Sequence, residues 1–158
     1  MENQLNIIER EFSSAAEAMP EDKYSFSPAG LNIQGSAFQD VRTFAQQVKH
    51  VATANYQFYS AALGEKPAVD TSNENGPASI TTKADIIKYL KDSFALGHRA
   101  AKTLTAQNFE ERVTFGEGKA TRLFLNTFAV AHAFDHYGQM VEYLRMNGII
   151  PPASRPQQ

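Results

Sequence analysis

The sequence predicts an all-α fold, a four-helix bundle, and three observations lead to this prediction. Four stretches carry apolar residues at intervals of three and four, the segments between them are rich in turn-forming residues, and no stretch shows the apolar–polar alternation of a strand. Helices with a one-sided apolar stripe bury it most simply against one another. With 158 residues, of which 42 % are hydrophobic, we expect one domain over residues 1–152 and a flexible tail over residues 153–158.

The first two expected helices cover residues 4–19 and 37–62. The first ends before Pro20, because proline cannot continue the helical hydrogen-bond ladder. The connector that follows ends in Ser36-Ala-Phe-Gln39, which has the pattern of a capping box, so the second helix should begin near residue 37. The many apolar residues of this helix imply that a wide face of it is buried, and Gly64 is a suitable residue to end it.

The third expected helix starts after Thr82, its N-cap, and ends near residue 105. The fourth covers residues 119–146, where Asn147-Gly148 is typical of a C-terminal cap. Two of the three connections are long, about 16 residues each, whereas antiparallel neighbours in bundles are usually joined by about 2–8 residues. The sequence therefore predicts long crossover connections.

Composition and charge exclude several functional classes. The chain has 15 basic and 17 acidic residues with no basic block, so nucleic acid is not an expected partner. It has no cysteine, which excludes disulfides, thiolate metal sites and a cysteine nucleophile. The N-terminus lacks the features of a signal peptide, and no stretch is long and uncharged enough to span a bilayer. We expect a cytoplasmic protein without a membrane partner.

The pair His132 and His136 is the main candidate for chemistry. Spacing of four places both imidazoles on one face of the fourth expected helix, one turn apart, where a single metal ion can reach both. The pair lies in a continuous apolar stripe: Leu125, Phe128, Ala129, His132, Ala133, His136, Met140 and Tyr143. Two core-facing histidines are either packing residues with hydrogen-bond partners or ligands of a shared ion.

A third ligand has two candidates, since the chain has four histidines in all. His50 lies toward the edge of the apolar stripe of the second expected helix. His98 lies on the third, four residues after Phe94 and three before Ala101. The pattern alone does not separate the two.

The fourth helix, with Ala131-His-Ala-Phe-Asp-His-Tyr-Gly-Gln-Met-Val-Glu-Tyr-Leu-Arg145 and then Asn147-Gly-Ile-Ile-Pro-Pro152, resembles the C-terminal signature of the DinB superfamily, a family of DinB/YfiT-like proteins. The segment of the second helix in which His50 precedes Ala-Thr-Ala-Asn-Tyr resembles that family's other ligand motif. The resemblance implies a crossover four-helix bundle with one divalent metal ion held by three histidines. Carried over by motif, these ligands are His50, His132 and His136; it is the resemblance that selects His50 over His98.

Three neutral imidazoles leave a divalent ion at least one open position for water or a substrate thiol. The resemblance therefore implies a metal-dependent hydrolase acting on a small-molecule substrate, or a thiol S-transferase whose partner is a low-molecular-weight thiol. We expect one divalent transition metal per chain, with zinc or nickel as first candidates. The alternative is a non-catalytic, metal-stabilised stress or interaction protein. The family also implies a homodimer.

Few residues qualify as a general base or as outer partners of the ligands. The candidates are Asn55 and Tyr56 after His50, His98 on the third helix, and Asp135 and Tyr137 beside the histidine pair. Asp135 points away from His136 around the helix, which favours a solvated charge. The stretch Gly116-Glu-Gly-Lys119 resembles part of a phosphate-binding loop but lacks the first glycine and the final Ser or Thr, so nucleotide binding is set aside.

Overall fold

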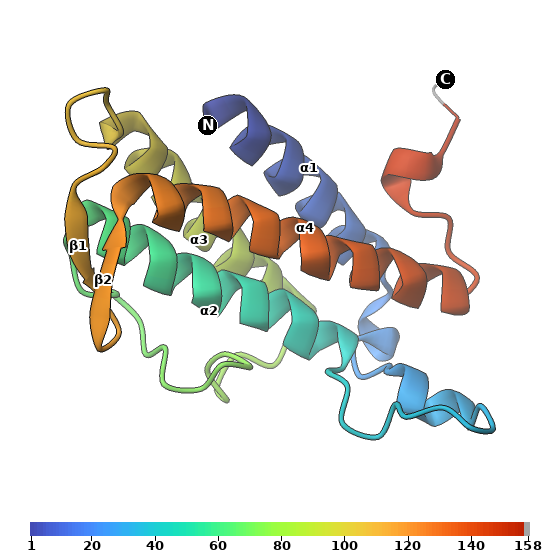
Figure 1. Cartoon of the computed structure of the whole chain (residues 1–158). Helices are drawn as coiled ribbons and strands as arrows, with labels where there is room; N and C mark the ends of the chain where they lie inside the picture. Colours follow the sequence, from blue (N-terminus) through green and yellow to red (C-terminus); the bar gives the residue numbers. More distant parts are fainter. Residues whose placement is uncertain (157–158) are drawn as a thin grey trace.

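The apolar stripes form four α-helices within residues 1–156, the part of the chain that the computed structural model describes (Figure 1). They are α1 (Glu2–Ala18), α2 (Phe44–Leu63), α3 (Lys83–Thr103) and α4 (Arg122–Met146). The expected four-helix architecture is confirmed. In this part of the chain, no helix is long and apolar enough to cross a membrane.

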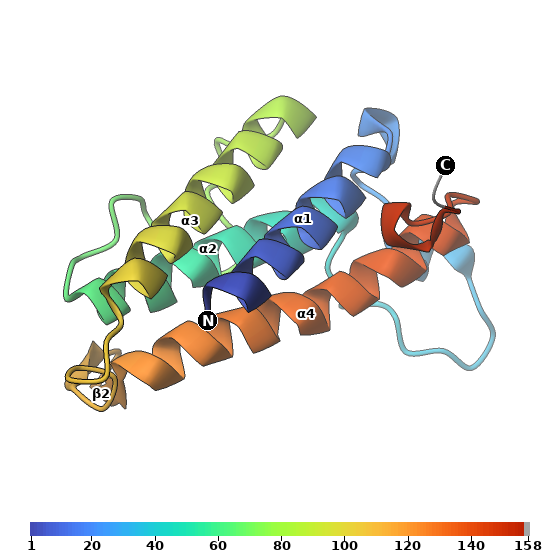
Figure 2. The same ribbon diagram turned by 90° about the horizontal axis from the view of Figure 1, so that it is seen from above.

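The helices do not alternate in direction along the chain. Helices α2 and α3 are parallel, because the residue numbers of their contact partners increase together. Thr53 contacts Tyr89 (3.0 Å between hydroxyls), and Asn55 contacts Ser93 (3.2 Å). Helix α2 runs antiparallel to α4, and α1 runs antiparallel to α3 (Figures 1 and 2). The long segment after α2 must therefore return along the whole length of that helix before α3 begins, which explains its length.

Two connections cross the bundle diagonally. Within residues 1–156, α2 packs mainly against α3 and α4, and α1 packs mainly against the same two helices. The connections from α1 to α2 and from α3 to α4 thus join helices on opposite corners. Crossover connections are a feature of the fold, as expected.

The start of α2 corrects the prediction. The helix begins at Phe44 rather than near residue 37, and Thr43 with Gln46 forms the capping box through bonds of 3.2 and 2.8 Å. The next free N–H groups, of Phe44 and Ala45, donate to carbonyls of the preceding connector at 2.8 Å each. Ser36 instead donates to the carbonyl of Ile33 in a turn. Because tertiary contacts satisfy the helix end, a local motif seven residues earlier does not start it.

A hairpin between α3 and α4 contradicts the expectation that no strand is present. Strands β1 (Arg112–Phe115) and β2 (Gly118–Thr121) pair antiparallel, with Gly116 at φ 57° in the two-residue turn between them. One face of the hairpin carries Val113, Phe115 and Ala120, which pack against the core. Four-residue strands are too short for alternation to stand out. Gly116 belongs to this turn, and because residues 119–121 lie in β2, α4 begins at Arg122, after its N-cap Thr121, rather than at the expected residue 119.

The other helix ends lie within two residues of those that the sequence predicts. Thr82 caps α3 by accepting from the N–H of Asp85, and Gly148 takes φ 73° after the Asn147 C-cap of α4. Residues Pro152–Ser154 form a 3-10 turn that contacts α1. The single domain over residues 1–152 and the flexible tail stay predictions, and part of that tail, residues 157–158, lies outside the described residues.

Candidate metal centre

Helices α2 and α4 bring three histidines together. His50 lies on the second turn of α2, and His132 and His136 lie one turn apart on the facing side of α4. One ring nitrogen from each lies within 4.8 Å of the others, and Nε2 of His50 is 3.1 Å from Nε2 of His132. The antiparallel pairing of the two helices produces this convergence, since a residue near the start of α2 faces the middle of α4.

Two of the three rings are oriented by a hydrogen bond at Nδ1, the nitrogen that faces away from the cluster. Nδ1 of His50 lies 2.6 Å from the main-chain oxygen of Glu74, and Nδ1 of His136 lies 2.6 Å from Oε1 of Gln47. Both partners are acceptors, so each Nδ1 carries the proton and donates it. The lone pair of each ring is consequently on Nε2, the nitrogen that faces the centre of the cluster. This arrangement is typical of histidines that bind metals.

Gln47 belongs to a chain of amides. While its Oε1 accepts from His136, its Nε2 donates to Oε1 of Gln139 at 2.8 Å. Gln139 in turn donates to the carboxylate of Asp135 at 3.0 Å. Gln47 is only 2 % exposed, so its amide orientation is set by these bonds rather than by water. The chain connects the buried ring of His136 to a surface carboxylate.

Burial keeps the histidine cluster neutral. It lowers the pKa of His136 to about 3, and the neighbouring histidines and Arg42 add to the effect. Burial likewise lowers the pKa of His132 to about 4, with a further contribution from His50. The pKa of His50 is also lowered by burial, although its bond to Glu74 opposes the shift. Imidazoles must be neutral to bind a metal, and these rings meet that condition at neutral pH.

The donor set fits a divalent transition metal. Tetrahedral zinc holds imidazole nitrogens at about 2.0–2.1 Å, which places neighbouring ligand atoms roughly 3.3 Å apart, close to the separation of the His50 and His132 nitrogens. Nδ1 of His132 is buried without a hydrogen-bond partner among the described residues. The polar contact of this ring is therefore made through Nε2, inside the cluster. Two facing nitrogen lone pairs repel unless a proton or a cation lies between them.

The segment between α2 and α3 supports His50 through its backbone. Gly76 takes φ 78°, and a Cβ built on it would lie 2.8 Å from Cβ of Lys49, so this segment lies directly on α2. Arg42 binds the side chains of Asn75 (2.8 Å) and Glu74 (3.0 Å). These contacts hold the Glu74 carbonyl against His50.

The structure does not bring the other candidates to this cluster. His98 lies on α3 and faces α1, with its two nitrogens 2.7 Å from the carboxylates of Glu2 and Glu9. Asn55 is buried and donates to Ser93 of α3, and Tyr56 stacks on Tyr89 of the same helix.

The two candidates on α4 differ in surroundings. Asp135 is exposed and is connected to the cluster by hydrogen bonds through Gln139 and Gln47. Tyr137 is half-buried against the core, and burial raises its pKa.

Sequence reasoning missed Gln47 and the Glu74 carbonyl. Gln47 precedes His50 by one helical turn, and a buried amide at that spacing is a signal that could have been used. The Glu74 contact has no such signal, because a main-chain carbonyl has no residue-type preference and depends on the path of the segment.

The fold and the site together define the class of protein: a helical crossover bundle in which three histidines of residues 1–156 converge on a candidate metal centre. The model of the DinB superfamily matches residues 4–140, and the chain belongs to that superfamily. The fold is also similar to the crystal structure of a DinB-like protein, YjoA of Bacillus subtilis, with a TM-score of 0.64 and 18 % identity, covering 98 % of this chain and 99 % of the other. No protein of curated function matches the chain.

Proposed function

We propose that His50, His132 and His136 hold one divalent transition metal ion, zinc or nickel in the first place, and that the protein is a metal-dependent enzyme. The observation that carries the proposal is the convergence of three neutral imidazoles, two of them oriented by hydrogen bonds from behind. A purely packing role does not require three ring nitrogens to face one point. Membership of the DinB superfamily supports the same assignment.

Access to the cluster favours catalysis over a sealed structural site. His136 is 7 % exposed, but His50 and His132 are only partly buried. Phe58 and Phe128 pack around His132, with ring centroids 6.0 and 6.4 Å from its own. A small molecule can therefore approach the cluster from its partly exposed side, along these two aromatic rings.

A divalent ion at this position supplies a Lewis acid that makes water or a thiol a better nucleophile at neutral pH. The protein holds the ligand rings through Glu74 and Gln47, keeps them neutral by burial, and surrounds the site with aromatic side chains that limit water. We propose either hydrolysis of an electrophilic substrate or transfer to a low-molecular-weight thiol. The chain has no cysteine, so the thiol would have to be a substrate.

The test compares the metal-loaded protein with the same protein treated with a chelator. One panel contains thiols with electrophiles, and a second contains esters and amides. We expect turnover in one panel, its loss on chelation, and its return when the ion is added back. His136→Ala should be inactive with added metal, whereas His98→Ala should retain the activity.

The non-catalytic alternative predicts a different result. A metal that only ties α2 to α4 would raise the melting temperature without turnover in either panel. Absence of any bound metal would contradict both readings. Homodimerisation remains a prediction, and it is tested by the mass of the protein in solution.

A further inference from the structure

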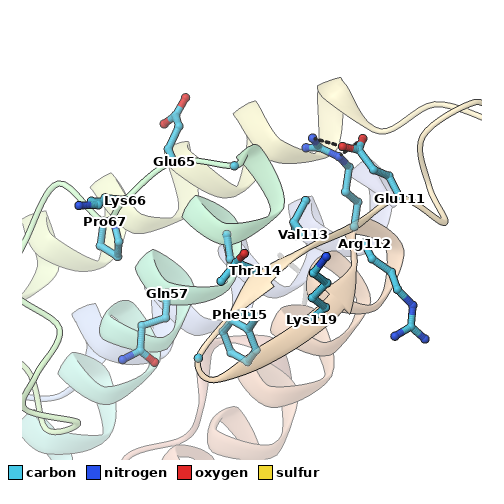
Figure 3. Close-up of a pocket in the computed structure, with 14 residues that line it drawn as sticks. Gln57, Glu65, Lys66, Pro67, Glu111, Arg112, Val113, Thr114, Phe115 and Lys119 are labelled. Carbon is cyan, nitrogen blue, oxygen red and sulfur yellow. Dashed lines mark hydrogen bonds and ion pairs between the residues drawn. The ribbon is translucent and has the colours of Figure 1, made fainter.

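A cavity of about 750 Å³ lies between the C-terminal half of α2, the start of the segment that follows it, and the β1–β2 hairpin. Figure 3 shows the side chains that surround it. None of the three clustered histidines lines it, so it is a separate feature of the molecule.

The charges around this cavity are not balanced. Its two carboxylates are engaged, since Glu65 pairs with Arg99 and Glu111 pairs with Arg122. Three cations at the cavity, Lys66, Arg112 and Lys119, have no ion-pair partner among residues 1–156. The cavity therefore carries net positive charge in a chain whose formal net charge is −2.

The cations differ in direction. In Figure 3 the Lys119 side chain points toward the middle of the labelled residues, while the guanidinium of Arg112 points away from them. Lys119 is the cross-strand partner of Thr114, so its ammonium group and the Thr114 hydroxyl belong to the same face of the hairpin. An ammonium and a hydroxyl are donors suited to a carboxylate or phosphate oxygen.

The cavity lies along the same side of α2 as His50. Gln57 and Ala61 line it, and they follow His50 by two and three helical turns, so the distance along the helix axis is about 10 to 16 Å. Phe58 connects the two regions, because its ring packs on Phe115 of the cavity (5.3 Å between centroids) and on His132 (6.0 Å). An elongated molecule with an apolar middle would contact both regions.

We infer that this cavity binds the anionic end of the substrate, a carboxylate or phosphate group held by Lys119 and Thr114, while the reactive end reaches the histidine cluster, about 10 to 16 Å away along α2. The substrate class is thus an anion whose charged and reactive groups are separated by an apolar spacer. Binding of the anion rests on the cavity alone, whereas the reach to the cluster rests on the proposed metal function.

The first measurement is an NMR titration of the full-length, zinc-treated protein with hexanoate, hexyl phosphate and hexanol. We expect one of the two anions to shift the amide signals of Thr114 and Lys119 and to bind about 10-fold more tightly than hexanol, as one charge-assisted contact implies. The stronger anion identifies the group. Lys119→Gln should remove this preference. Arg112→Gln makes the same change in charge on the same strand pair, but it should weaken binding no more than about twofold.

The second measurement tests the reach to the cluster. With cobalt-loaded protein, the thiolate charge-transfer band reports thiol binding at the metal. We expect 8-mercaptooctanoate to bind about 10-fold more tightly than 8-mercaptooctanol, and 3-mercaptopropionate to gain nothing over 3-mercaptopropanol, because it is too short. Lys119→Gln should abolish the advantage of the long acid.

The outcomes separate the two proposals. Equal binding of anions and hexanol, or equal effects of Lys119→Gln and Arg112→Gln, would overturn the inference while leaving the metal centre intact. If the protein binds no metal, the proposed function fails, but the titration with hexanoate and hexyl phosphate still decides whether the cavity binds anions. An advantage for the long acid that survives Lys119→Gln would also overturn the inference.

Discussion

Histidines lie in two contacts between antiparallel helices, which we call the α1–α3 seam and the α2–α4 seam. The two seams favour opposite charge states of the imidazole. Between α1 and α3, burial lowers the pKa of His98, but hydrogen bonds to Glu9 and Glu2 outweigh it and leave the pKa raised. Between α2 and α4, burial, the neighbouring imidazoles and Arg42 lower the pKa of His132 to about 4 and that of His136 to about 3, and the carboxylate of Asp135 opposes the shift of His132 only in part. The same residue type is therefore stabilised as a cation in one seam and as a neutral ring in the other.

The difference shows what makes a histidine suitable for metal binding in a helical bundle. An imidazole with a carboxylate at each ring nitrogen is favoured in its protonated form, because only the imidazolium has an N–H for each carboxylate. An imidazole whose outer nitrogen donates to a carbonyl or an amide keeps its other lone pair free. The uncharged acceptors, the Glu74 carbonyl and the Gln47 amide, thus set the free lone pairs of His50 and His136 toward the cluster.

The largest expected effect is loss of metal from the α2–α4 seam. Purified protein kept away from chelators should contain about one divalent ion per chain by element analysis. His132→Ala or His136→Ala should reduce this to near zero, with affinity at least about 100-fold lower, because a ligand is lost rather than an outer partner. His98→Ala should leave the content unchanged. An equal loss in all three variants would mean that His98, and not His50, is the third ligand.

A smaller effect is expected at the amide behind His136. Gln47→Met removes the acceptor of the Nδ1 proton at nearly equal volume, and outer partners of this kind contribute about 10- to 100-fold to metal affinity. Gln47→Glu is the matched control, because its carboxylate can still accept that proton and should retain the affinity. Competition with a chromogenic chelator measures both variants. Unchanged affinity in Gln47→Met would show that His136 is oriented by packing alone.

The histidine pair on α4 was predictable because its spacing and its stripe are local properties of one helix. The caps at Thr82 and at Asn147-Gly148 were predictable for the same reason. The start of α2 was not, because carbonyls of the connector at Tyr24 and Phe26 satisfy its first N–H groups. Such contacts between distant segments leave no pattern in the sequence around residue 37.

The third histidine shows the same limit within the site. Periodicity left His50 and His98 equivalent, and the family resemblance selected His50. In the structure the two histidines have different neighbours, because the direction of each helix decides which helix it packs against. His50 meets His132, whereas His98 meets two carboxylates of α1. The hairpin was missed because β1 and β2 have four residues each, and it supplies one wall of the cavity beside α2.

Backbone support of His50 gives a third prediction, with a smaller effect on the same seam. Gly76→Ala adds a Cβ 2.8 Å from that of Lys49 at a φ of 78°, so the segment that carries the Glu74 carbonyl must move. We expect metal affinity to fall by roughly 3- to 10-fold, because the acceptor is displaced rather than removed. Gly35→Ala has the same strain, at φ 80°, with open space around it, and should leave metal affinity unchanged. Equal losses in both variants would attribute the effect to general destabilisation.

The smallest effect is expected in the α1–α3 seam, where it depends on pH. Because the pKa of His98 is raised in the folded protein, its contribution to stability is fully present below the unfolded value of about 6.5 and is lost as the pH rises through the folded value. In metal-free protein, His98→Gln should lower the Tm by about 2–4 °C at pH 6, as partly exposed pairs worth about 1 kcal/mol imply, and by less at pH 9. Lys91→Gln breaks the pair with Glu17 in the same seam, where no imidazole takes part, so its effect should be the same at both pH values. A His98→Gln difference that grows with pH would show that His98 is neutral in the folded protein, and the contrast between the two seams would then be wrong.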